Sequence, residues 1–237
     1  MPSIVGVIPA RYASKRFPGK PLALLKGKSI IWWVFNQAKK ALDNVLIATD
    51  DERIKKEAEN FGANVIMTSP EHPSGTDRIG EVVKTLDVSL VINIQGDQPL
   101  IPPEMIQGVI KELQNPSILM ATLKKEIDKN LADNPNIVKV VVDKDDFALY
   151  FSRGKIPYSG RYYKHIGIYG YKKDFLLTFI NLPKGKLEIE EDLEQLRALE
   201  NGYKIKVATT EYDSPSIDTK EDLKEIQKYY NFILKPV

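Results

Sequence analysis

Apolar runs alternate with helix-like segments along the first half of the chain, and this alternation limits the fold more than any other feature. The runs cover residues 3–8, 45–48, 65–68 and 90–94. The last of them is apolar except for Asn93, which is typical of a central parallel strand covered on both faces. Repeated strand–helix rounds predict a Rossmann-like, doubly wound α/β sheet of the mixed type.

The second half of the chain is richer in predicted strands. These strands cover residues 118–123, 138–142, 148–151 and 166–171, and fewer helices separate them. A helix over 189–200, a strand over 204–208 and a helix over 219–232 follow. We predict one α/β domain over residues 1–237, with residues 118–186 inserted as a smaller β-rich sub-domain.

A basic loop follows the first predicted strand. Residues 9–22, named the basic loop below, contain Arg11, Lys15, Arg16 and Lys20 but no carboxylate, and the first acidic residue of the chain is Asp43. Crowded cations repel one another unless an anion lies between them. Ligands of open α/β sheets bind beyond the carboxyl ends of strands. We therefore predict a phosphate-binding loop; the alternative is a solvated basic loop.

Two common phosphate-binding motifs are absent from this part of the sequence. Gly27-Lys28-Ser29 resembles the end of a P-loop, but that motif requires glycine where Leu22 stands. No Gly-x-Gly-x-x-Gly follows the first predicted strand. The basic loop therefore indicates a different kind of nucleotide site.

Composition excludes several classes of protein. The chain has 237 residues and a net charge of +2, which gives no reason to expect bulk binding of nucleic acid. It has no cysteine, so disulfides and thiolate chemistry are excluded. Its apolar runs are too short for a membrane span or a signal peptide, which predicts a cytoplasmic protein. Tyrosines crowd residues 150–171, and we expect a homodimer to form there.

Two aspartates are candidate ligands for magnesium. Asp97 follows the most apolar predicted strand, on the same edge of the sheet as the basic loop. Magnesium prefers one or two carboxylates together with phosphate and water oxygens. A turn or helix-capping role is the alternative for Asp97. For Asp218, which precedes the last predicted helix, capping and metal binding explain the sequence equally well.

Several other residues have two open interpretations. Ser74-Gly75-Thr76-Asp77-Arg78 either caps a helix or contacts a nucleotide base. His165, at the start of an aromatic strand, is either a core residue or a ligand contact. Arg153 ends a predicted strand, where it is able to bind a carboxylate through two hydrogen bonds.

Taken together, these motifs resemble a known family. The resemblance rests on Pro9-Ala-Arg-Tyr-Ala-Ser-Lys-Arg-Phe-Pro-Gly-Lys-Pro-Leu22, Ser74-Gly-Thr-Asp-Arg78, Gln95-Gly-Asp97, Ala148-Leu-Tyr-Phe-Ser-Arg153, His165-Ile-Gly-Ile-Tyr-Gly-Tyr171, Leu193-Glu-Gln-Leu-Arg197 and Asp218-Thr219. These motifs span the chain in the order found in the sugar-acid cytidylyltransferases. They are most similar to the branch that activates 3-deoxy-D-manno-octulosonate (Kdo).

The resemblance implies an enzyme that converts CTP and Kdo to CMP-Kdo and diphosphate with Mg²⁺, for lipopolysaccharide biosynthesis. It implies catalytic roles for Arg11, Lys20, Asp97 and Asp218, with both aspartates as metal ligands. The implied nucleotide contacts are Ala10, Arg11, Ser14, Arg16, Lys20, Ser74, Gly75 and Arg78. The implied sugar-acid contacts are Gln95, Arg153, His165, Tyr169, Glu188 and Gln195.

Two positions depart from the family pattern. Gln98 stands where glutamate is usual, and Lys15 stands where threonine or serine is usual. The first change removes a negative charge beside the expected metal, and the second adds a cation beside the expected phosphates. Two alternative functions remain: an enzyme like CMP-sialic acid synthetase, and a module that binds CTP without catalysis.

Overall fold

A computed structural model of the chain describes residues 3–14 and 16–233, with side chains described through residue 228. The chain divides into two compact units. The terminal unit contains Val5–Leu86, Asn93–Pro103 and the residues from Ser214 onward. The central unit contains the residues up to Ile4, Asp87–Ile92 and Glu104–Asp213. Within the described residues, no helix is long and apolar enough to cross a membrane.

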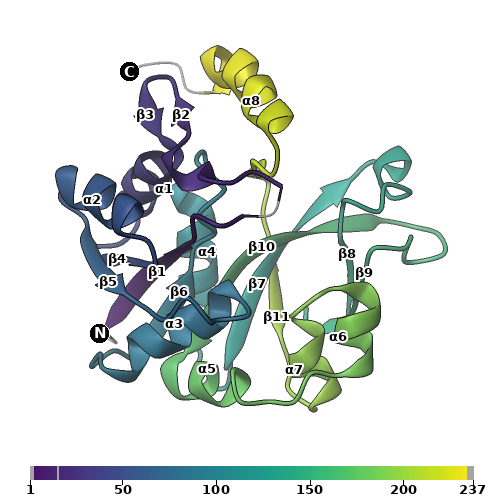
Figure 1. Ribbon diagram of the computed structural model, residues 1–237. Helices are drawn as coiled ribbons and strands as arrows, with labels where there is room; N and C mark the ends of the chain where they lie inside the picture. The colour runs from purple at the N-terminus through teal and green to yellow at the C-terminus, as the bar shows by residue number, and fades with distance from the viewer. Residues whose placement is uncertain (1–2, 15, 234–237) are drawn as a thin grey trace. The chain divides into compact units, whose positions relative to one another are not determined.

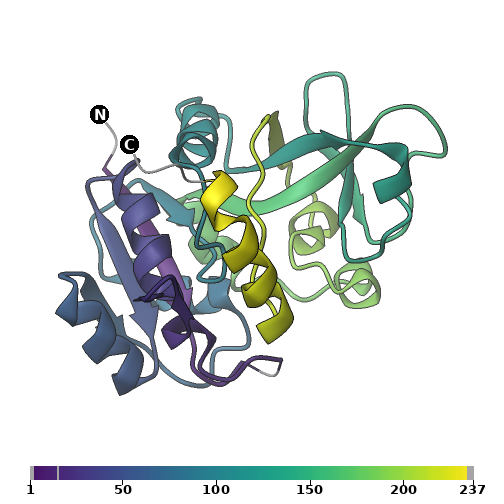
Figure 2. The same ribbon diagram turned by 90° about the horizontal axis from the view of Figure 1, so that it is seen from above.

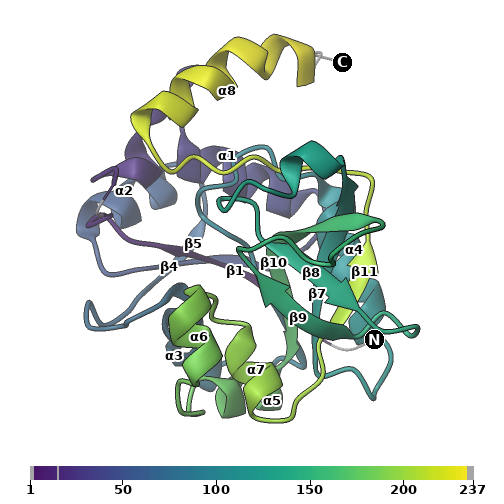
Figure 3. The ribbon, with the colours of Figure 1, turned by 90° about the vertical axis from the view of Figure 1, so that its right-hand side faces the viewer.

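The terminal unit is built around three parallel strands (Figure 1). β1 (Ile4–Ala10) pairs with β4 (Val45–Thr49), and β4 pairs with β5 (Asn64–Met67). Helices α1 (Ile30–Lys39) and α3 (Gly75–Lys84) lie on opposite sides of these strands (Figure 3). Helices on both faces of parallel strands are the doubly wound arrangement that the sequence predicts.

The remaining elements of the terminal unit are small or near the end of the chain. They are the 3₁₀ turn η1 (Lys20–Leu22), the hairpin of β2 (Leu24–Leu25) and β3 (Lys28–Ser29), α2 (Glu52–Asn60) and α8 (Lys220–Ile233). α8 lies beside the hairpin, where the Gln227 side chain donates a hydrogen bond to the Leu24 carbonyl at 3.1 Å (Figure 2). The hairpin does not correspond to any strand predicted from the sequence.

Polar side chains begin three helices of this unit. The Ser29 hydroxyl accepts a hydrogen bond from the Trp32 N–H at the start of α1. Asp51 accepts from the Arg53 N–H at the start of α2, and Ser74 accepts from the Asp77 N–H at the start of α3. Each cap satisfies a backbone donor that has no partner inside its helix.

The central unit contains the mixed part of the sheet. Its strands are β6 (Leu90–Asn93), β7 (Met120–Ile127), β8 (Lys139–Val142), β9 (Ala148–Ser152), β10 (Tyr162–Lys172) and β11 (Lys206–Thr209). β10 is antiparallel to β7 and β8, whereas β11 is parallel to β7. All four residues of β6 are buried, in agreement with the predicted central strand. The predicted mixed α/β fold is confirmed, while the division into a domain and an inserted sub-domain over 118–186 stays a prediction.

The helices of the central unit differ from the prediction at one place. They are α4 (Pro103–Leu113), α5 (Lys173–Phe179), α6 (Lys186–Glu191) and α7 (Leu196–Glu200), with the 3₁₀ turn η2 (Lys129–Leu131). Figure 3 shows α5, α6 and α7 grouped on one side of β8, β9 and β10. The predicted continuous helix over 189–200 is wrong, because Asp192 adopts a left-handed conformation with φ 53° and ends α6. Aspartate tolerates this conformation, and the sequence carries no glycine or proline there.

At Gly170, β10 packs closely against α4. A Cβ atom at Gly170 would lie 2.4 Å from Cγ1 of Val109 and 2.6 Å from Cδ1 of Leu113. Gly170→Ala should therefore lower the free energy of unfolding by about 1–3 kcal/mol through overpacking, as measured by urea denaturation. Gly167→Ala is the matched control, because a Cβ atom there meets nothing within 4 Å. Equal stability of the two variants would contradict the prediction.

Candidate functional site

The basic loop folds back on itself directly after β1. The Tyr12 carbonyl accepts hydrogen bonds from the Ser14 N–H at 2.9 Å and from the Gly19 N–H at 2.8 Å. Gly19 has φ 73°, a conformation that favours glycine, and it precedes η1. Lys15, one of the four cations of the loop, lies outside the described residues. The Tyr12 carbonyl therefore joins described residues on both sides of Lys15.

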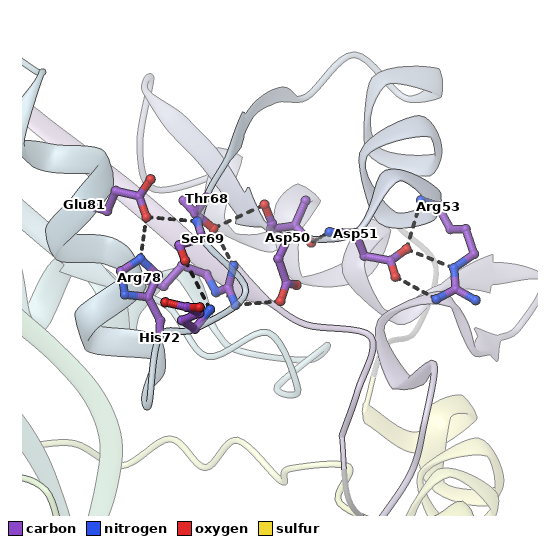
Figure 4. A network of polar contacts seen from close by, with 10 residues as sticks. Asp50, Asp51, Arg53, Thr68, Ser69, His72, Arg78 and Glu81 are labelled. Carbon is purple, nitrogen blue, oxygen red and sulfur yellow. Dashed lines mark hydrogen bonds and ion pairs between the residues drawn. The ribbon is translucent and has the colours of Figure 1, made fainter.

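Tyr12 and Arg53 support this loop, although the sequence pattern indicated neither of them. A Cβ atom at Gly19 would lie 3.1 Å from the Tyr12 ring, so glycine allows the close approach. The Arg53 guanidinium lies 3.3 Å from the centroid of the Tyr12 ring. Asp51 holds Arg53 through hydrogen bonds of 3.0 and 2.7 Å, and these bonds lower the pKa of the Asp51 carboxyl (Figure 4). This contact fixes the loop against the start of α2.

Four predicted site residues meet in one cluster of charges. The Lys20 ammonium lies 2.8 Å from a carboxylate oxygen of Asp97 and 3.5 Å from one of Asp218. The Arg16 guanidinium lies 2.8 Å from the same Asp218 oxygen. The Ile217 N–H donates to the Asp97 carbonyl at 2.9 Å, which joins the two segments that carry the aspartates. We name Arg16, Lys20, Asp97 and Asp218 the charge cluster.

The helix cap at the start of α8 is made by the residues that follow Asp218. The Thr219 hydroxyl accepts a hydrogen bond from the Asp222 N–H at 3.1 Å. In return, the Asp222 carboxylate accepts from the N–H groups of Thr219 and Asp218 at 2.8 and 2.9 Å. This reciprocal arrangement caps α8. The carboxylate of Asp218 is thus not used as a cap and faces the cations instead.

The charge cluster fits the ligands that magnesium needs. Asp97 and Asp218 come from distant segments, yet both reach the same ammonium. Their side chains are 27% and 32% exposed, so an ion and its water molecules have access to them. Within the described residues, no group of three or more His, Asp or Glu side chains is able to hold a metal. A site with two carboxylates suits Mg²⁺ that takes its other ligands from phosphate and water.

Two glycines bring the other predicted segments close to the end of β1. A Cβ atom at Gly96 would lie 2.8 Å from the Pro9 carbonyl oxygen, and one at Gly75 would lie 3.1 Å from the Pro9 ring. Pro9 is followed by Ala10, which is buried. The segments carrying Asp97 and Ser74 therefore both converge where β1 enters the basic loop.

Arg78 belongs to a buried polar network (Figure 4). Its side chain is 3% exposed and lies 3.1 Å from a carboxylate oxygen of Asp50, and it also contacts the Thr68 hydroxyl. On the same helix, Glu81 contacts His72 and accepts a hydrogen bond from the Ser69 N–H at 3.0 Å. The hydrogen bond from His72 lowers the pKa of Glu81. The network anchors the loop before α3, and the nucleotide contact assigned to Arg78 stays a prediction.

Three further predicted contacts of the terminal unit, Arg11, Ser14 and Gln95, are exposed or half-buried. Arg11 is exposed and Ser14 is half-buried. The Gln95 amide lies 3.4 Å from the Asn93 side-chain oxygen. Gln98, which departs from the family pattern, is buried, and its Oε1 has no hydrogen-bond partner among the described residues.

Two predicted sugar-acid residues of the central unit are uncharged at neutral pH. Burial lowers the pKa of His165 to about 3 and raises that of Tyr169, and their rings lie 5.5 Å apart. The Thr122 hydroxyl lies 2.7 Å from the Ile168 carbonyl and 3.0 Å from Nε2 of His165. Since a hydroxyl has one proton, which goes to the carbonyl, Nε2 of His165 is assigned as the donor to Thr122.

Glu188 and Gln195 are both buried, but they differ in their partners. The Glu188 carboxylate accepts two hydrogen bonds from the Arg197 guanidinium, at 2.8 and 2.6 Å. Nε2 of Gln195 has no hydrogen-bond partner among the described residues. An unpaired buried donor costs about 1–3 kcal/mol, so a ligand oxygen would stabilise it. The sugar-acid contacts assigned to both residues stay predictions.

Similarity to known proteins shows which family the chain belongs to. The sequence profile of the cytidylyltransferases matches residues 5–205. The chain belongs to the cytidylyltransferase family. A 3-deoxy-manno-octulosonate cytidylyltransferase from Thermodesulfovibrio yellowstonii is 53% identical, and the match covers 95% of this chain and 97% of that protein. An 8-amino-3,8-dideoxy-manno-octulosonate cytidylyltransferase from Shewanella frigidimarina is 51% identical over 93% of this chain and 96% of its own length.

A solved structure agrees with these relatives. A CMP:2-keto-3-deoxy-manno-octonic acid synthetase in complex with CTP superposes with a TM-score of 0.94 at 38% identity. The match covers 98% of this chain and all of the other chain, 100%. The resemblance stated from the sequence motifs is confirmed at the level of the family and of the fold.

Proposed function

We propose that this cytidylyltransferase transfers CMP from CTP to 3-deoxy-D-manno-octulosonate and releases diphosphate. The charge cluster carries the proposal, because it joins two basic-loop cations to two carboxylates. The names of the relative at 53% identity and of the CTP-bound structure supply the substrates. A binding module without catalysis has no evident use for two carboxylates beside a phosphate-binding loop.

The residues of the terminal unit would act mainly by binding and charge neutralisation. Arg11, Arg16 and Lys20 would contact the triphosphate, with Ser14 as a further donor. The anomeric hydroxyl of the sugar acid would attack the α-phosphorus in line and lose its proton to water as the new P–O bond forms. The bond to diphosphate would break, and its electron pair would leave on the diphosphate oxygen. Fixed cations stabilise the charge that develops on the phosphoryl oxygens.

Asp97 and Asp218 would hold Mg²⁺. The bound ion would neutralise phosphate charge and lower the pKa of the attacking hydroxyl. Lys20, which the two carboxylates now share, would then be available to the phosphates. The two aspartates would thus bind Lys20 in the absence of the ion and Mg²⁺ in its presence.

The residues of the central unit would bind the sugar acid. Arg153 would contact its carboxylate, and Gln195 would use its unpaired donor for a substrate oxygen. His165 and Tyr169 are uncharged at neutral pH and would contribute hydrogen bonds to hydroxyl groups. We further propose a cytoplasmic homodimer. The exposed Leu149, Tyr158 and Ile189 of the central unit support the dimer, and a monomer in light scattering would refute it.

A diphosphate-release assay tests the proposed function. CTP, UTP, ATP and GTP are each combined with Kdo, 8-amino-Kdo or sialic acid in the presence of Mg²⁺, and products are identified by mass spectrometry. We expect release with CTP and Kdo, with CMP-Kdo as the product. The Shewanella relative makes 8-amino-Kdo the second candidate. Release with sialic acid alone, or CTP binding without any release, would contradict the proposal.

A further inference from the structure

One carboxylate on α6 binds three groups at the end of β9. Oε1 of Glu191 accepts hydrogen bonds from the Ser152 hydroxyl at 2.7 Å and the Tyr150 hydroxyl at 3.3 Å. Oε2 accepts from the Arg153 N–H at 2.8 Å. Burial by itself raises the pKa of Glu191, but these hydrogen bonds outweigh it, and the net pKa lies below its ordinary value. Glu191 is therefore ionised and fully engaged with β9.

The same short segment also directs the Arg153 side chain. Nε of Arg153 donates to the Glu191 carbonyl at 2.9 Å, and Nη2 lies 3.3 Å from the Asp192 carbonyl. The left-handed conformation of Asp192 ends α6 at this point. The Arg153 side chain remains 39% exposed. Nη1 lies 3.5 Å from the Pro135 carbonyl, so each nitrogen of the guanidinium has a partner within the chain, while the side chain stays partly accessible to a ligand.

A buried lysine holds Arg153 from the opposite side of its backbone. Lys139 is 0% exposed, and its ammonium donates to the carbonyls of Arg153, Ile137 and Asn134 at 2.5, 2.6 and 3.0 Å. An ammonium has three protons, and three carbonyls accept them. Burial lowers the pKa of Lys139, and the negative charge of Glu191 opposes this effect. Arg153 therefore has its N–H bound by Glu191 and its carbonyl bound by Lys139.

We propose that Glu191 and Lys139 are positioning residues that hold Arg153 in the orientation needed to bind the carboxylate of the sugar acid. This inference rests on the proposed function and extends it. A two-bond contact between arginine and a carboxylate depends strongly on geometry. A guanidinium that is already ordered loses little conformational entropy when the ligand binds. Neither residue needs to touch the substrate to have this effect.

The test separates the two substrates. Glu191→Gln keeps the size of the side chain but replaces one acceptor oxygen by a donor that opposes the β9 donors. We expect KM for Kdo to rise about tenfold, while KM for CTP changes less than twofold. Glu190→Gln is the matched control, because Glu190 is the adjacent, exposed glutamate. Lys139→Met should likewise raise KM for Kdo and change KM for CTP less than twofold.

A double-mutant cycle shows whether Glu191 acts through Arg153. In an Arg153→Ala background, Glu191→Gln should have no further effect on KM for Kdo. An unchanged effect in that background, or equal changes in the two KM values, would overturn the inference. If Glu191→Gln does not fold, Ser152→Ala removes a single donor to Glu191 and should raise KM for Kdo about two- to threefold; no change would equally overturn the inference. Turnover of CTP and Kdo by the unaltered protein decides the proposed function independently.

Discussion

Asp97→Asn should lower kcat for CMP transfer by about 10²–10³-fold and leave the fold unchanged. The substitution removes the charge of one of the two carboxylates that contact Lys20 and that would hold Mg²⁺. Because the Asp97 side chain is partly exposed and its backbone bond to Ile217 is retained, stability should change little. Initial rates of diphosphate release at saturating CTP and Kdo measure the effect, and urea denaturation checks the fold.

A magnesium titration identifies the cause of the loss. Asp97→Asn and Asp218→Asn should both raise the Mg²⁺ concentration that gives half-maximal rate. Asp43→Asn makes the same change of charge at an exposed position of the terminal unit and should leave the rate unaltered. A near-normal rate for Asp97→Asn at saturating Mg²⁺ would show that Asp97 does not contribute to catalysis as we propose.

The sequence predicts the basic-loop cations and Asp97 of the charge cluster better than it predicts Asp218. The basic loop and Asp97 follow directly from strand order, because side chains at the carboxyl ends of strands share one edge of the sheet. For Asp218 the sequence did not decide between a helix cap and a metal ligand. The structure shows that Thr219 begins the capping interaction with Asp222, and only this detail leaves Asp218 available to Arg16 and Lys20.

Partners that depend on the packing of elements were not predictable from spacing. Arg78 pairs with Asp50, which lies two elements earlier in the chain. The hydrogen bonds of Glu191 to β9 occur where α6 ends at Asp192. The sequence has no glycine or proline there that would indicate the end of a helix. A continuous amphipathic helix over 189–200 would instead have given a solvated acidic face. The sequence therefore predicted the fold and the basic loop, but not the ion pairs that order the site.

Arg197→Met should lower the free energy of unfolding by about 3–5 kcal/mol. The side chains of Arg197 and Glu188 are only 4% and 8% exposed, and they share two hydrogen bonds. Removal of the guanidinium leaves the Glu188 carboxylate buried without its principal counter-charge, whereas methionine fills most of the volume. Urea denaturation followed by circular dichroism measures the loss.

Two further variants decide whether Glu188 is mainly an ion-pair partner or a substrate contact. Glu188→Gln combined with Arg197→Met removes the buried charge and should recover most of the lost stability, because replacing both members of a buried pair costs far less than removing one. Lys155→Met breaks the more exposed pair with Asp133 and should change stability much less. If Arg197→Met were as stable as Lys155→Met but raised KM for Kdo, Glu188 would be free to bind the sugar acid, and its pairing with Arg197 would be incidental.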